Sequence, residues 1–188
     1  MSKLGELKEI LKKLIAIPSV TGNEHDIAIY IADYLRQCGV DSVELQPVEG
    51  KRLNVVAHLK GEKVGPVVLL TGHMDTVAPG EGWRTDPFKA TERDGRIYGR
   101  GAADMKGGIA AILVAIRNAA AQREQMRGEA IIAFVCDEEA YSKGVDALIR
   151  SGIRADYGIA AEPEWDAVIG AVGKMLIKVR VYGIAAHG

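Results

Sequence analysis

The sequence predicts an α/β fold: a three-layer sandwich with a mostly parallel central sheet. Three short apolar segments have the composition of buried strands, at residues 66–71, 130–135 and 157–161. Helical patterns separate them, an alanine-rich one at 105–121 and a shorter one at 143–151. Because strands that alternate with helices form parallel sheets, we expect helices to cover both faces of this sheet.

The residues before these strands predict two helices and two shorter strands. Apolar side chains recur at helical spacing in residues 4–16. Thr21 and Glu24 have the T-x-x-E spacing of a capping box, which predicts a second helix over 23–38. Short strand patterns follow at 43–45 and 54–59. After the α/β segment, residues 175–182 alternate between apolar and polar side chains, which is typical of a strand with one exposed face.

Composition narrows the class of protein. Of the 188 residues, 48% are hydrophobic and 26% are charged, as in a soluble globular domain with a substantial core. The formal net charge of −1 argues against a nucleic-acid or anionic-membrane partner. No apolar segment approaches the ~20 residues that a membrane span needs. Lysines interrupt the early apolar residues, so we expect no signal peptide, and the two isolated cysteines, Cys38 and Cys136, favour a reducing, cytoplasmic setting.

Acidic residues and one histidine follow the predicted strands. The first strand ends in TGHMDT, the second in CDEE and the third in AEPE, and an aspartate stands at the expected N-cap of the alanine-rich helix. These residues are, in order, His73, Asp75, Asp104, Asp137, Glu138, Glu139, Glu162 and Glu164. Because the carboxyl ends of parallel strands meet at one edge of a sheet, we expect these side chains to converge there.

Converging carboxylates repel one another, and a bound metal ion removes that repulsion. One imidazole with several carboxylates is a donor set that suits zinc, manganese or cobalt. Two metals ~3.5–4 Å apart need a carboxylate between them, and Asp104 is a candidate bridge. A further carboxylate can take a proton from water held by the metal. Asp75 lies two positions after His73, so it can hold the second ring nitrogen of that histidine.

Each of these features alone has a simpler interpretation. A histidine at a strand end is usually a surface group, an N-cap aspartate usually only caps its helix, and a D-E-E run is usually a solvated turn. Their coincidence at one sheet edge favours the metal site. Cys136 is an alternative nucleophile, although no histidine is near it in the sequence and a buried core thiol is the simpler interpretation. The glycines of residues 99–108 match neither phosphate-binding pattern.

Six segments, in this order, resemble a family of zinc metallopeptidases that includes acetylornithine deacetylase, succinyl-diaminopimelate desuccinylase, aminoacylase and glutamate carboxypeptidase. The segments are GHMDTV (72–77), GWRTDPF (82–88), YGRGAADMKGG (98–108), DEE (137–139), AEP (161–163) and GIAAHG (183–188). The resemblance implies that His73, Asp104 and Glu162 hold one zinc ion. Asp104 and Glu139 would hold a second, with cobalt or manganese as alternatives to zinc.

The resemblance also implies a reaction and its catalytic residues. The family hydrolyses the amide bond of an N-acyl amino acid or small peptide with water activated between two zinc ions. Asp75 would orient the ligand histidine, and Glu138 would act as general base and acid. His187 would help to stabilise the oxyanion, commonly from a partner subunit.

Family members are considerably longer than this chain. The resemblance therefore implies a catalytic domain at 1–172, in its N-terminal part, and the start of a lid or dimerisation domain at 173–188. The family completes its second zinc site with a late histidine beyond these residues, so we expect weak or absent activity of this chain. We also expect exposed apolar surface where the rest of a family member would pack on the sheet, and homodimerisation through the lid. Two alternatives stay open: a metal-binding but catalytically incomplete fragment or relative, and a thiol enzyme that uses Cys136.

Overall fold

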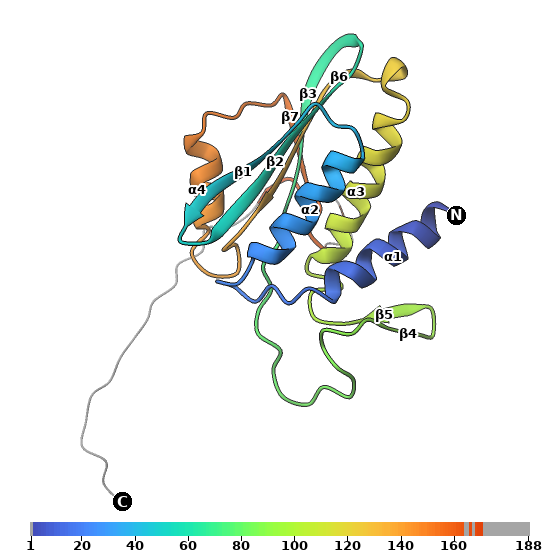
Figure 1. Ribbon diagram of the computed structural model, residues 1–188, viewed down its shortest axis with the longest axis vertical. Coiled ribbons are helices and arrows are strands. Elements are labelled where there is room, and N and C mark those ends of the chain that lie inside the picture. Colours follow the sequence, from blue (N-terminus) through green and yellow to red (C-terminus); the bar gives the residue numbers. More distant parts are fainter. Residues whose placement is uncertain (1, 164–165, 167, 171–188) are drawn as a thin grey trace, which may run out of the picture.

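A five-stranded sheet with helices on both faces confirms the predicted α/β sandwich (Figure 1). The computed structural model describes residues 2–163, 166 and 168–170. The strand order is β1 (Ser42–Glu49), β2 (Arg52–Lys60), β6 (Arg127–Val135), β3 (Lys63–His73) and β7 (Tyr157–Ala160). β3 runs parallel to both β6 and β7, whereas β2 pairs with β1 and β6 in antiparallel fashion. The parallel part of the sheet therefore contains the three strands whose ends carry the expected site.

Three helices pack on one face of the sheet and one on the other (Figure 1). The first group is α1 (Lys3–Ile15), α2 (His25–Gln37) and α3 (Lys106–Ala120), and α4 (Lys143–Arg150) lies on the opposite face. The larger core lies between the sheet and the three helices, with Leu14, Ile31 and Phe134 fully buried. A smaller core lies under α4 around Leu148. In the described part of the chain, no helix combines the length and apolar character that crossing a bilayer requires.

The strands and helices predicted for residues 1–163 are all present, with ends that differ by a few residues. The largest differences are at β1, expected only at 43–45, and at β3, which extends beyond the expected 66–71 at both ends. The predicted strand at 175–182 and the second domain at 173–188 lie outside the described residues. Local periodicity therefore located the elements, while their lengths depend on the pairing of the strands.

The predicted capping box is wrong. α2 begins at His25 with Glu24 as its N-cap, and the Glu24 side chain makes no capping hydrogen bond. Instead its carboxylate is fully buried and accepts hydrogen bonds from Arg52. The Thr21 hydroxyl donates to Asp75 rather than capping the helix. Both side chains of the expected box thus contact distant parts of the chain, and Glu24 forms a buried ion pair with Arg52 and does not cap the helix.

A short hairpin lies between β3 and α3. β4 (Thr91–Arg93) and β5 (Arg96–Tyr98) pair in antiparallel fashion. Asp94 and Gly95 at the turn both have positive φ, of 53° and 71°. An Asp-Gly pair is typical of such hairpin turns, so the sequence does contain the pattern that predicts this element.

The strand at the β7 edge is more exposed than its apolar sequence predicts. All four of its residues are exposed, with Tyr157 at 67% and Ile159 at 56%. The described helices explain this, because α4 packs on β1, β2 and β6 and leaves this edge uncovered. Exposed apolar surface, which the sequence also led us to expect, is therefore found on this strand.

Candidate metal centre

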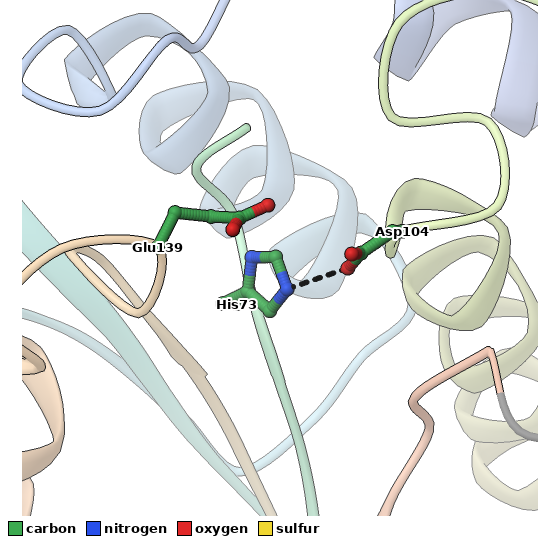
Figure 2. A group of neighbouring side chains, drawn as sticks. All are labelled: His73, Asp104 and Glu139. Atoms are coloured by element: carbon green, nitrogen blue, oxygen red, sulfur yellow. Dashed lines mark hydrogen bonds and ion pairs between the residues drawn. The ribbon is translucent and has the colours of Figure 1, made fainter. Parts of the chain in front are cut away.

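Three of the four expected metal ligands meet at the carboxyl ends of β3 and β6 (Figure 2). His73 is the last residue of β3, Glu139 lies in the turn that follows β6, and Asp104 comes just before the first turn of α3. One ligand atom from each lies within 4.8 Å of the other two. Because β3 and β6 pair in parallel, His73 and Glu139 lie at the same edge of the sheet, as the sequence predicts.

Glu162 joins this group from the residues that follow β7. His73 Nε2 lies 2.9 Å from Asp104 Oδ1 and 3.7 Å from Glu162 Oε2. The imidazole itself is only 2% exposed, whereas the two carboxylates that face it are partly open to solvent. The site therefore has a buried nitrogen at its base and accessible oxygens around it, an arrangement that suits a metal ion to which substrate has access.

The other ring nitrogen of His73 is held by Asp75. His73 Nδ1 lies 2.8 Å from the main-chain carbonyl oxygen of Asp75 and 3.6 Å from its carboxylate. The carbonyl can only accept, so Nδ1 carries the proton and Nε2 is left to face the carboxylates. The sequence predicts Asp75 as the partner of His73. Because β3 ends at His73, the two residues are not alternate positions of one strand, and the nearer contact is made by the main-chain carbonyl of Asp75.

The Asp75 carboxylate is fully buried and holds the turn after β6. Its two oxygens accept the backbone N–H groups of Glu138 at 3.0 Å and Glu139 at 3.1 Å. The Thr21 hydroxyl donates to it at 2.9 Å. Burial alone would raise the pKa of Asp75, but hydrogen bonds from His73 and from these groups hold it below its usual value. The residue is therefore a charged acceptor at neutral pH that links the histidine to the acidic turn.

The remaining carboxylates repel one another. Burial raises the pKa of Glu139, and the charge of Asp104 raises it further. Burial also raises the pKa of Glu162; His73 lowers it, while Asp104, Glu138 and Glu139 raise it. In the described residues, no lysine or arginine pairs with Asp104, Glu139 or Glu162. A nitrogen and several oxygens that lack a lysine or arginine partner fit a borderline divalent ion such as zinc, cobalt or manganese.

Glu138 lies in the same turn as Glu139, where its charge contributes to the raised pKa of Glu162. The structure thus brings the expected base to the edge of the sheet with the expected ligands. His187 lies outside the described residues.

Cys136 is a buried core thiol. Its side chain is 0% exposed, and burial raises the pKa of the thiol to about 12, with a further contribution from Glu24. Its backbone N–H donates to the Asn54 side chain at 3.1 Å. A protonated, inaccessible thiol is a poor nucleophile, so this geometry argues against the thiol-enzyme alternative.

Sequence reasoning missed a fully buried lysine beside the site. The Lys106 ammonium donates to the carbonyl oxygens of Leu14 at 2.9 Å and Ile17 at 2.8 Å. It therefore ties the first turn of α3, and with it the neighbouring Asp104, to the end of α1. Burial lowers the pKa of Lys106 to about 8. A lysine at the start of an apolar helix gives no indication in the sequence that it will be buried.

Comparisons with known proteins all point to one family. A model described as peptidase family M20/M25/M40 matches residues 69–181. The succinyl-diaminopimelate desuccinylase of Nautilia profundicola is 34% identical over 193 residues, which cover 95% of this chain and 50% of that protein. The desuccinylase of Bordetella avium is 38% identical over 173 residues, which cover 88% and 45%. The chain thus spans about half the length of the curated relatives it matches.

Solved structures agree with this assignment. Human carnosine dipeptidase 1 superposes with a TM-score of 0.72 at 25% identity, over 83% of this chain and 38% of that chain. A metallo-carboxypeptidase of the M20 family from Sulfolobus solfataricus gives a TM-score of 0.73 at 25% identity, over 83% and 37%. The sandwich fold is therefore shared with a dipeptidase and a metallo-carboxypeptidase.

Proposed function

The chain belongs to peptidase family M20/M25/M40, and on this premise we propose that it builds the metal centre of a hydrolase that cleaves the amide bond of an N-acyl amino acid or small peptide. One observation carries the proposal. The Nε2 atom of His73 faces Asp104 and Glu162, and Glu139 lies within the same 4.8 Å group as His73 and Asp104. Family membership alone would leave the residues open, and this juxtaposition supports the choice of these four.

The proposed centre is dinuclear. His73, Asp104 and Glu162 would hold one zinc ion, and Asp104 would bridge to a second that Glu139 also binds. Cobalt or manganese would fit the same donors. When bound, the metal polarises the substrate carbonyl and lowers the pKa of water.

The protein side chains would handle the protons. Glu138 would take a proton from the attacking water and deliver it to the leaving amine nitrogen. Asp75 would keep the proton of His73 on Nδ1, so that Nε2 stays available. His187 would stabilise the oxyanion of the tetrahedral intermediate, supplied by a partner subunit if the protein dimerises through a second domain.

The substrate class is inferred from the relatives. Two relatives are named desuccinylases of an N-acylated diamino acid, and two structural neighbours are a dipeptidase and a carboxypeptidase. The chemistry that these names share is hydrolysis of an amide bond. We therefore propose N-succinyl and N-acetyl amino acids and dipeptides as substrates.

Metal analysis combined with a substrate panel tests the proposal. We expect freshly purified protein to contain a divalent metal. Zinc-dependent turnover of a panel member, even if weak, that vanishes in Glu138→Gln while the metal is retained would support the proposal. Asp146→Asn is a matched control, since Asp146 is a solvated carboxylate on α4. Stoichiometric metal without turnover of any panel member would instead favour the metal-binding, catalytically incomplete alternative. Protein that binds no metal would refute the site as described.

A further inference from the structure

The turn that carries Glu138 and Glu139 is built around the preceding residue, Asp137. The backbone of Asp137 has φ of 70°, in the left-handed region, which aspartate adopts more readily than most non-glycine residues. Its carboxylate Oδ2 accepts the backbone N–H of Tyr141 at 3.2 Å and of Lys143 at 3.1 Å. A single buried carboxylate thus folds the turn back on itself and connects it to the start of α4.

A buried arginine holds this carboxylate from the other side. Arg52, the first residue of β2, forms an ion pair with it, with Nη2 2.7 Å from Asp137 Oδ1. The same guanidinium donates to Glu24, from Nη2 at 2.5 Å and from Nε at 3.0 Å. The side chains of Arg52, Glu24 and Asp137 are 12%, 0% and 2% exposed. Because two buried carboxylates share one guanidinium, removing it would leave both without their paired cation.

These contacts join those of Asp75 into one network around the turn. Glu24 Oε1 also accepts the backbone N–H of Gly22 at 3.0 Å. The adjacent Thr21 hydroxyl donates to Asp75, whose carboxylate binds the backbone N–H groups of Glu138 and Glu139. The turn is therefore held at its first residue by Arg52 and at its next two residues by Asp75.

β2 supports the ends of the same turn with a second side chain. Asn54 lies two residues along the strand, on the same face as Arg52. Its Oδ1 accepts the N–H of Cys136 at 3.1 Å, and its Nδ2 donates to the carbonyl of Gly144 at 2.8 Å. The strand next to the parallel part of the sheet thus supports the turn from before Asp137 to the first residues of α4.

We infer that Arg52 is a positioning residue for the metal centre: by bridging Glu24 to Asp137, it fixes the turn from which Glu138 and Glu139 reach the site. The inference rests on the proposed function for the role of those two glutamates. A lysine could not replace it, because a single ammonium lacks the planar fork that presents separate N–H groups to two carboxylates.

Co²⁺ binding and hydrogen exchange test this role in the full chain. The variants are Arg52→Lys, Arg52→Met and a matched control, Arg117→Gln. The control removes the arginine of α3 that pairs with the largely buried Glu6 of α1. We expect Arg52→Lys to fold, to bind Co²⁺ about 10- to 100-fold more weakly and to change its visible spectrum. In the metal-free protein, the amides of residues 138–143 should exchange faster. Arg117→Gln should match the wild type in all three measurements.

Co²⁺ binding and hydrogen exchange together separate this inference from the proposed function. Wild-type affinity, spectrum and exchange rates in Arg52→Lys would overturn the inference, and Arg52→Lys decides it if Arg52→Met fails to fold. A wild-type chain that binds no Co²⁺ would refute the proposed function. The exchange rates of the turn would then still decide whether Arg52 positions it, with unchanged rates in Arg52→Lys overturning that role.

Discussion

The carboxylate of Asp75 accepts the backbone N–H of Glu138 at 3.0 Å. Its second oxygen accepts the N–H of Glu139 at 3.1 Å, and its main-chain carbonyl lies 2.8 Å from His73 Nδ1. One residue therefore connects the end of β3 to the turn after β6. The expected ligand from each strand depends on it, although the Asp75 carboxylate lies beside Nδ1 of His73 and the other carboxylates face Nε2.

Asp75→Asn should weaken metal binding without removing a ligand. The substitution keeps the shape of the side chain but turns one acceptor oxygen into an N–H₂ donor that faces other donors. We expect about 10- to 100-fold weaker Co²⁺ binding and a loss of about 1–3 kcal/mol in the free energy of unfolding. Isothermal titration and urea unfolding measure the two effects. Asp156→Asn, at an exposed carboxylate that accepts the N–H of Val67, should leave Co²⁺ binding unchanged; equal binding by both variants would contradict the prediction.

The stability of the metal-free protein should fall as the pH rises through the pKa of His73. Burial alone lowers the pKa of this histidine, but the carboxylates of Asp75 and Glu162 raise it from 6.5 to about 9. The folded state therefore holds the proton more tightly than the unfolded chain does. The resulting stabilisation is complete below pH 6.5 and is lost as the pH rises through about 9. Metal binding should show the opposite trend and strengthen with pH, because the proton must leave.

Urea unfolding in the presence of a chelator measures this dependence. Lys106 acts in the opposite direction, since burial lowers its pKa to about 8 and stability then rises with pH above that value. The comparison is therefore between the wild type and His73→Gln, which share the lysine. A decline over this pH range that is equally steep in His73→Gln would show that the histidine is not its source.

The expected ligands could be predicted because they depend on local sequence and one topological rule. His73, Glu139 and Glu162 each follow a short apolar segment, and the carboxyl ends of parallel strands share an edge. The Arg52 bridge could not be predicted, because its partners lie far away in the sequence and nothing local distinguishes a buried arginine from a surface one. Burial of β7 was overpredicted for a related reason, since exposure depends on which helices cover a strand.

Iodoacetamide should modify Cys38 but not Cys136 in the folded protein. Cys136 is fully buried, and burial raises the pKa of its thiol to about 12, so thiolate is scarce at pH 8. Cys38 is only partly buried. Mass spectrometry before and after denaturation should show one labelled cysteine and then two. Rapid labelling of Cys136 in the native state would return the thiol-enzyme alternative to consideration.

Gly108→Ala should weaken both stability and metal binding, because this glycine lets α3 approach the segment that carries Glu162. A Cβ atom at Gly108 would lie 2.1 Å from the carbonyl oxygen of Ala161, which is main chain and cannot rotate away. Alanine is the better helix former by about 1 kcal/mol, so a site with free space would gain stability. We expect a loss of about 1–3 kcal/mol instead, with Co²⁺ binding weakened as Glu162 is displaced. Gly80→Ala, where a Cβ meets no atom within 4 Å, is the control for unfolding and Co²⁺ titration. A Gly108→Ala variant that gains stability and keeps its Co²⁺ affinity would show that α3 does not fix the position of Glu162.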